Sequence, residues 1–218
     1  MSALLMAPLL MTAGGSPQGQ VEYLSNGSYS WVVPAGVTAI SAVVVNASQN
    51  GLSSIKRGST DLLTGDTTLG GGVGGGNGGY YSLNSTGAGA GGYSGNGGNG
   101  DVGAYANGSG GGGGGVNTFA SARGGGVGLK GEGASGAGGN PGNHGSIPPG
   151  DVARGAGRAG GPQYSYAGNL RWKNDIGVTP GETLTVNVGY GYSVAECDGG
   201  VRIIWGGGRS YPNNAGDV

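Results

Sequence analysis

Glycine is the residue that most limits how this chain can fold, and it is concentrated in one part of it. Residues 70–168 hold 41 of the 59 glycines in a chain of 218 residues. Glycine has no side chain to bury, and it loses more backbone entropy on ordering than any other residue. Such a segment therefore either stays unfolded as a linker or folds with backbone, in place of side chains, as its interior.

The spacing of these glycines favours the ordered alternative. They recur at every third residue in runs, the longest being Gly133, Gly136, Gly139, Gly142 and Gly145. A polyproline II helix has roughly three residues per turn, so each run places bare backbone along one edge of such a helix. Bare edges can approach until hydrogen bonds form between neighbouring helices. We therefore predict an inserted glycine-rich polyproline II bundle over residues 70–168. Collagen is excluded because the longest run is only five triplets with one proline.

The other residues of this segment gather in short islands between the glycine runs, at 80–86, 101–107, 116–123, 146–154 and 163–166. If the runs form rods, the islands form the turns that connect them, and loops on a rigid scaffold are common binding sites. Tyr, Asn and Ser dominate the islands, as they dominate antibody binding loops. The candidate binding residues are Tyr80, Tyr81, Asn84, Tyr105, Asn107, Phe119, His144, Arg154, Tyr164 and Tyr166. The alternative that stays open is that the tyrosines only cap the ends of the bundle.

The flanking residues 20–69 and 169–218 form a β-rich domain by prediction. Strands are indicated at 29–33, 37–47, 170–176, 183–188 and 201–205 by β-branched, aromatic and alternating residues. Neither flank has enough strands for a core of its own, so the two together predict a small β-sandwich with little or no α-helix. The turns at 34–36 and 179–181 should lie at the same end of it. The continuous apolar run at 42–45 predicts a strand buried on both faces, and Trp31, Trp172 and Trp205 are expected in the core.

Residues 1–19 begin with an apolar run that contains Leu4, Leu5, Leu9 and Leu10. No basic residue precedes Lys56, so the run lacks the charged start typical of a secretory signal. It is also too short to cross a bilayer, which argues against membrane insertion. We interpret this N-terminal segment as an apolar peg that docks on a partner protein or on the chain's own core, with the four leucines as its contacts.

The composition argues against several kinds of chemistry. The net charge is −1, without the clustered Lys and Arg that nucleic acid requires. His144 is the only histidine and Cys197 the only cysteine, so no metal site, disulfide or His-based catalytic set is indicated. A G-x-G-x-x-G match at 87–92 has neither the strand before it nor the helix after it that dinucleotide binding needs. We expect a protein without catalytic residues or cofactors.

Three stretches carry a resemblance when taken in order around the glycine-rich middle: YSWVVPAGVTAISAVVV at 29–45, LRWKNDIGVTPGETLTVNVGYG at 170–191 and GGVRIIWGGGRSYPNNAGDV at 199–218. Together they resemble the glycine-rich modules of bacteriophage tail-fibre and other virion proteins. The middle is similar in style to the tip adhesin of T-even-type long tail fibres. In that family, glycine-rich motifs form a sandwich of polyproline II helices. Variable loops at its distal end bind outer-membrane proteins or surface sugars.

The resemblance implies a virion protein of the tail fibre or tail tip, made in the host cytoplasm, that binds a host-surface protein or glycan. The island residues above would contact the receptor. The four N-terminal leucines would dock on other phage tail or fibre proteins, and attachment to a trimeric fibre leaves the copy number open. A purely structural virion component, such as a joint, plug or decoration, is the alternative. Ice binding would need flat, regular faces, which the islands interrupt.

Overall fold

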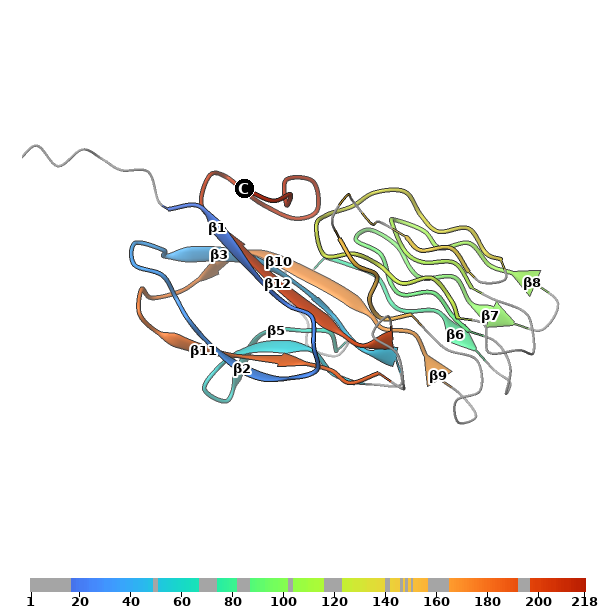
Figure 1. Ribbon diagram of the computed structural model, residues 1–218, viewed down its shortest axis with the longest axis horizontal. Coiled ribbons are helices and arrows are strands. Elements are labelled where there is room, and N and C mark those ends of the chain that lie inside the picture. Colours follow the sequence, from blue (N-terminus) through green and yellow to red (C-terminus); the bar gives the residue numbers. More distant parts are fainter. Residues whose placement is uncertain are drawn as a thin grey trace, which may run out of the picture.

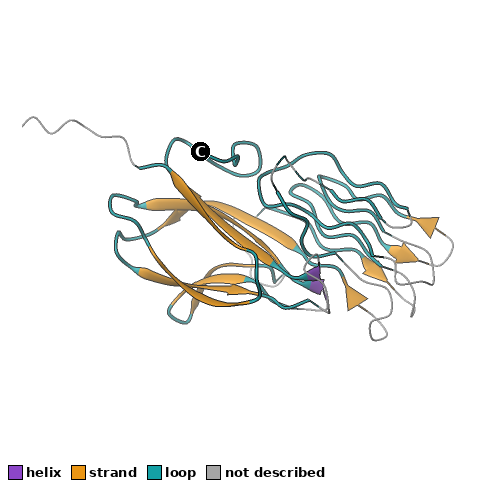
Figure 2. Ribbon diagram, in the orientation of Figure 1, coloured by secondary structure: helices purple, strands orange, loops and turns teal. Residues whose placement is uncertain are grey.

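Two antiparallel sheets form one end of the molecule, and the glycine-rich segment extends from them toward the other end (Figure 1). The computed structural model describes residues 17–48, 51–66, 74–81, 87–101, 104–115, 123–139, 142–145, 147, 149, 151–156, 165–191 and 197–218. Over these residues the protein is mainly β and has essentially no helix (Figure 2). The described chain begins at the sheet end, beside β1 (Figure 1).

The two sheets have four strands each and draw on both flanks of the sequence. The first has the order β1 (Gly19–Tyr23), β12 (Gly200–Trp205), β3 (Ala39–Val45) and β10 (Leu170–Gly177). The second has the order β2 (Gly27–Val32), β11 (Thr183–Val188), β4 (Ser54–Arg57) and β5 (Thr60–Thr64). Strands from the two flanks alternate in the first sheet, and in the second sheet β11 lies between β2 and β4. The predicted β-sandwich built from both flanks is therefore confirmed as a β-sandwich-like pair of sheets.

The core between the sheets comes from residues that alternate along the strands. Ile40, Ala42 and Val44 of β3 belong to one buried cluster with Leu184 and Val186 of β11. Trp31 belongs to this cluster and Trp205 packs against it, with the two ring centroids 5.6 Å apart. The predicted neighbouring turns are also confirmed, because Gly181 N donates to Val33 O at 2.9 Å and Val178 N donates to Thr38 O at 2.9 Å.

All five strands predicted from the sequence are present, and three other strands of the two sandwich sheets were missed. These are β1, β4 and β5, with sequences GQVEY, SIKR and TDLLT. All three are short; β1 alternates over only four residues, and the polar residues of β4 and β5 break the alternation that identifies a half-buried strand. β4 and β5 form a hairpin whose turn contains Gly58 at a φ of 57°, a conformation that glycine adopts readily.

The strand β3 is buried on both faces, as its apolar run predicts. Its second face, with Val43 and Val45, belongs to a second cluster that includes Ile204 and Leu170 of the same sheet. Tyr93, Val127 and Leu129 of the glycine-rich segment join this cluster, as does Tyr211 near the C-terminus. The outer face of the first sheet is therefore the base on which the glycine-rich part is packed.

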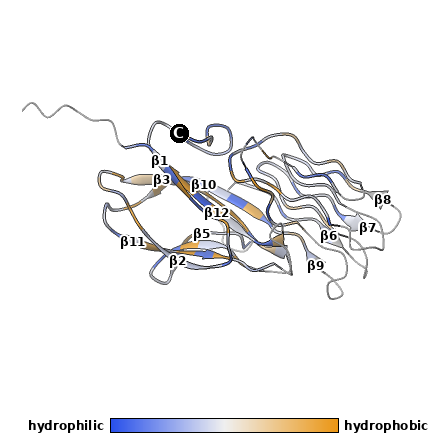
Figure 3. Cartoon of the chain, viewed as in Figure 1, coloured by the Kyte–Doolittle hydropathy of each residue, from blue (hydrophilic) through white to orange (hydrophobic). Residues whose placement is uncertain are grey.

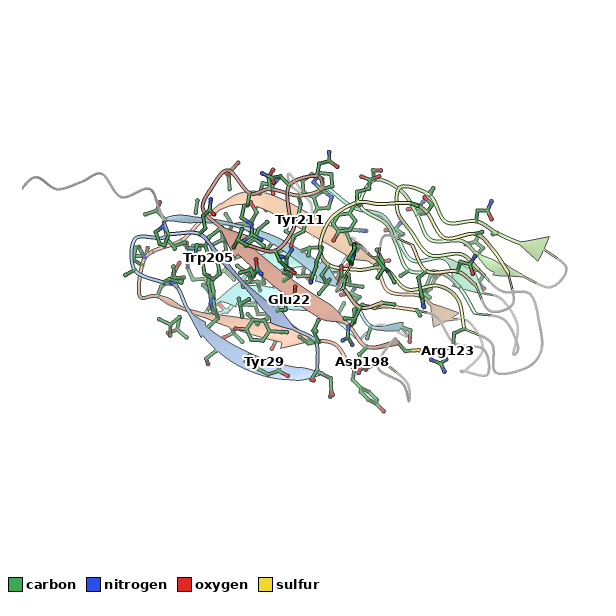
Figure 4. All side chains as sticks on the ribbon, turned by 45° about the horizontal axis from the view of Figure 1, so that its top comes forward. Glu22, Tyr29, Arg123, Asp198, Trp205 and Tyr211 are labelled. Carbon is green, nitrogen blue, oxygen red and sulfur yellow. The ribbon has the colours of Figure 1, made fainter. Side chains whose placement is uncertain are left out.

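Main-chain hydrogen bonds, more than side chains, connect neighbouring segments of the glycine-rich part. Gly76 and Gly79 donate to the carbonyls of Gly92 and Gly89, each at 2.8 Å. The next pair has the same three-residue step, since Gly136 and Gly139 donate to Gly112 O at 2.8 Å and Gly115 O at 3.1 Å. Among the described residues, side chains crowd the sandwich and thin out over this part (Figure 4), which is mostly pale in hydropathy (Figure 3).

The close approach of these segments leaves no room for side chains. A Cβ atom built on Gly89 would overlap the carbonyl oxygen of Gly113, and one on Gly113 would overlap that of Gly125. One on Gly125 would overlap the carbonyl oxygen of Asn143. Because backbone contacts backbone through several layers, neither partner can move aside as a flexible side chain would.

The C-terminal residues fold back and connect the two parts of the molecule through charged groups. Asp217 Oδ2 lies 2.7 Å from Lys130 Nζ of the glycine-rich part, and Asp217 Oδ1 lies 3.0 Å from Arg202 Nη2 of β12. The Arg202 side chain is 0% exposed, and its Nε lies 2.8 Å from Glu22 Oε1. The Lys130 ammonium is the main cause that lowers the pKa of Asp217, with Arg202 acting in the same direction.

Gly125→Ala should lower the free energy of unfolding by about 1–3 kcal/mol or more, because the added methyl group must displace backbone. The measurement is urea denaturation of the full chain. Gly177→Ala is the matched control, since a Cβ atom there meets nothing within 4 Å. Equal stability of the two variants would show that the glycine packing is not tight.

Asp217→Asn should make the protein less stable at neutral pH than the unsubstituted chain. The folded-state pKa of Asp217 is depressed, so its stabilisation is present above the ordinary Asp pKa of about 3.9 and is lost as pH falls through the lower folded value. Thermal unfolding across acidic pH should therefore show the two proteins converging. A stability difference that stays constant down to low pH would contradict this assignment.

Candidate binding surface

Four short strands lie at the end of the molecule farthest from the start of the described chain (Figure 1). They are β6 (Tyr80–Tyr81), β7 (Gly100–Asp101), β8 (Ala104–Tyr105) and β9 (Ser165–Tyr166), in the order β8-β7-β6-β9. Each comes from or borders one of the islands predicted from the sequence. The fold thus brings three separated islands together at one end, which we call the tip.

Two predicted tyrosines meet directly at the tip. Tyr80 and Tyr166 are opposite each other in the antiparallel pair of β6 and β9. Their ring centroids are 5.2 Å apart at an interplanar angle of 48°, a geometry favourable for aromatic pairs. Tyr166 is 50% exposed. A ring that is held in place and half open to solvent is suited to contact a partner.

Asparagine side chains extend the main-chain hydrogen bonding beside the tip. Asn96 Oδ1 accepts from Asn77 N at 2.8 Å, and Asn99 Oδ1 accepts from Tyr80 N at 3.0 Å. The two donors and the two acceptors are each three residues apart, the same step as the glycines. Asn99 therefore positions β6 and its tyrosines.

Two of the polar candidates have structural partners inside the glycine-rich part. Asn107 Oδ1 accepts from Gly138 N at 2.8 Å, and His144 Nδ1 accepts from Gly126 N at 3.0 Å. Both residues are exposed, so each combines a scaffold hydrogen bond with an open face. The backbones of Tyr81 and Tyr105 lie in β6 and β8.

Arg154 requires a correction. It is 7% exposed, with its backbone paired to Val127 in a β-bridge, so its side chain is not on the surface of the chain. Burial lowers the pKa of its guanidinium, while Asp198, Asp151 and Glu22 oppose that shift. The Arg154 side chain therefore lies in the interior of the protein. A sequence pattern cannot distinguish a buried arginine from an exposed one.

The remaining candidates lie outside the described residues. They are Asn84, Phe119 and Tyr164 in the islands, and Leu4, Leu5, Leu9 and Leu10 in the N-terminal segment.

A hollow of about 370 Å³ lies beside Tyr166, where the tip chains run back to the sandwich. Its described lining includes Asn46, Asn77 and Asn169 together with Ala167. A second hollow of about 340 Å³ lies near the start of β1, against Trp205 and Arg209. Both volumes are at the lower end of the range for small-molecule sites, roughly 300–1,000 Å³.

In the part of the chain that the structure describes, no group of three or more His, Cys, Asp or Glu side chains could hold a metal ion. No helix in the same residues is long and apolar enough to cross a membrane.

Comparison of the chain with protein-family models, with curated proteins and with solved structures found no match.

The sequence analysis did not identify Asn96, Asn99 or Tyr93. Tyr93 is buried, donates from its OH to Gly128 O at 3.0 Å, and stacks on Tyr211 with centroids 6.0 Å apart. Burial raises the pKa of both phenols. The three-residue step from Asn96 to Asn99 was an available signal, because it matches the glycine step around it.

Asn99→Ala should loosen the tip without unfolding the chain, because it removes the acceptor of Tyr80 N–H. The local cost should be about 1 kcal/mol, the typical net value of one hydrogen bond. Amide hydrogen exchange at Tyr80 should become faster. Asn213→Ala, on an exposed residue of the C-terminal turn, is the control, and unchanged exchange at Tyr80 in the Asn99 variant would refute the positioning role.

Proposed function

We propose that this protein is a phage tail-fibre tip or a related virion protein that binds a host cell-surface receptor. The observation that carries the proposal is the tip: chain segments far apart in sequence converge at one end and present paired tyrosines, Tyr80 and Tyr166, on a rigid backbone scaffold. Tyrosine suits this role because its stiff ring gives a large contact area at low entropy cost. Binding without catalysis or cofactor is the activity we infer.

The scaffold in this proposal is a bundle of polyproline II helices. Main-chain donors at a three-residue step support it, as in Gly76 with Gly79 and in Gly136 with Gly139. That step equals one turn of a polyproline II helix, so the two donors of each pair lie on the same edge of their helix. Such a bundle has no side chains that must repack, and its turns can vary in sequence while the rods stay in place.

The proposed orientation places the tip toward the host and the N-terminal segment toward the virion. The described chain starts beside β1 at the sandwich end, with the tip at the other end (Figure 1). The partners would be other tail or fibre proteins at the sandwich end and a host-surface protein or glycan at the tip. The net charge is only −1 in 218 residues. Such a small charge does not favour binding to nucleic acid or electrostatic attraction to a strongly charged surface.

Replacing the aromatic residues of the tip and islands should abolish attachment of the purified full-length protein to host cells. The test variant carries alanine at Tyr80, Tyr81, Tyr105, Phe119, Tyr164 and Tyr166. A loss of about tenfold or more in cell binding is expected, since aromatic anchors usually dominate recognition. The measurement is flow cytometry with labelled protein.

The control is Tyr190→Ala, which removes an exposed tyrosine of the sandwich and should leave attachment unchanged. Unfolding curves of both variants separate lost binding from lost fold. Attachment that survives the six substitutions would reject the tip as the receptor site. A protein that binds no host cell, yet is enclosed by other subunits in the virion, would instead be a purely structural component.

A further inference from the structure

The hollow beside Tyr166 has an unusual lining, because three asparagine amides converge on it from three elements. Asn46 follows β3, Asn77 precedes β6, and Asn169 precedes β10. The hollow lies between the sandwich and the tip, so its walls are anchored on both. It shares Tyr166 with the proposed receptor surface.

Hydrogen bonds hold the three amides with their oxygens facing protein donors. Asn46 Oδ1 accepts from Ser53 N at 2.9 Å, and Asn169 Oδ1 accepts from Gly78 N at 2.9 Å. Asn77 Oδ1 accepts from Arg171 Nη2. Because each oxygen faces an N–H group, the assignment of oxygen and nitrogen in each amide is determined by its partner.

The amide nitrogens are therefore the groups that remain for a ligand. Each Nδ2 carries two hydrogens that can be donated. Within the described residues one bond uses them, from Asn169 Nδ2 to Gly65 O at 3.1 Å. The hollow is thus rich in oriented donors, and its ligand should supply oxygen acceptors.

The charged residues around the hollow further limit the kind of ligand that it can bind. The described lining contains no Lys, Arg, His, Asp or Glu. The guanidinium of Arg171, which bonds to the lining residue Asn77 through Oδ1, also donates to Gly76 O and Leu170 O, and burial lowers its pKa. Among these described residues an ionic ligand would find no free counter-charge, whereas a neutral polar one would not need it.

We propose that this hollow binds an uncharged saccharide. Sugar oxygens would accept from the amides of Asn77 and Asn169, and the apolar face of the ring would lie on Tyr166, whose ring is held by Tyr80. A few placed polar groups beside an aromatic surface are the usual makeup of a small-ligand site. This inference rests on the proposed function, because it names the receptor chemistry for part of the same surface.

The test is saturation-transfer NMR on the full-length protein with methyl glycosides of neutral hexoses and of N-acetylhexosamines. At least one glycoside should give transfer, and Asn77→Asp should weaken its binding about tenfold by replacing donors with acceptors of the same shape. Tyr166→Ala should weaken it similarly, while Tyr166→Phe, which keeps the ring, should not. Asn213→Asp makes the same chemical change on the exposed C-terminal turn and should have no effect.

No transfer from any glycoside, or transfer that is equal in the Asn77 and Asn213 variants, would overturn the saccharide site. The two proposals fail separately. If cell attachment depends on the tip aromatics but survives Asn77→Asp, the receptor function stands and the saccharide site falls. If purified protein binds the glycoside through Asn77 but binds no host cell, the saccharide site stands and the receptor function falls.

Discussion

The glycine-rich part of the molecule depends on direct hydrogen bonding between bare backbones. A glycine segment can approach its neighbour with no Cβ atom between them, and Gly113 N donates to Ala90 O while Gly125 N donates to Gly114 O. These bonds oppose the large entropy cost of ordering glycine. A side chain introduced by substitution inside the layers of this part would contact backbone that cannot move aside.

The sandwich gives this backbone scaffold a surface to form on. Strand β3 is buried on both faces, and the outer face of the first sheet, with Val43, Val45 and Ile204, packs on Tyr93, Val127 and Leu129. The second cluster contains the large buried apolar side chains of the glycine-rich part within the described residues. The C-terminal residues strengthen the junction, because Asp217 bridges Lys130 and the fully buried Arg202. Anchoring at one end leaves the other end free to present the tip.

The tip illustrates how a scaffold without side chains positions residues that have them. Tyr80 is held through its backbone by the side chain of Asn99, and its ring is held by Tyr166 from a strand 86 positions later in sequence. The same scheme orients the amides of the neighbouring hollow through their oxygens. Polar residues thus complete the scaffold and, with their remaining donors, become available to a ligand.

The sequence by itself determined the fold class, five of the eight sandwich strands, the neighbouring turns and the two-sided burial of β3, because these depend on local alternation and turn residues. The sequence also identified Tyr80 and Tyr166 as candidate binding residues. Only the tertiary structure decided that Arg154 is buried, that Asn96 and Asn99 accept from Asn77 N and Tyr80 N, and that three amides line one hollow. Contacts of this kind join residues distant in sequence, and in a segment with few side chains no periodicity shows which stretch of chain lies beside which.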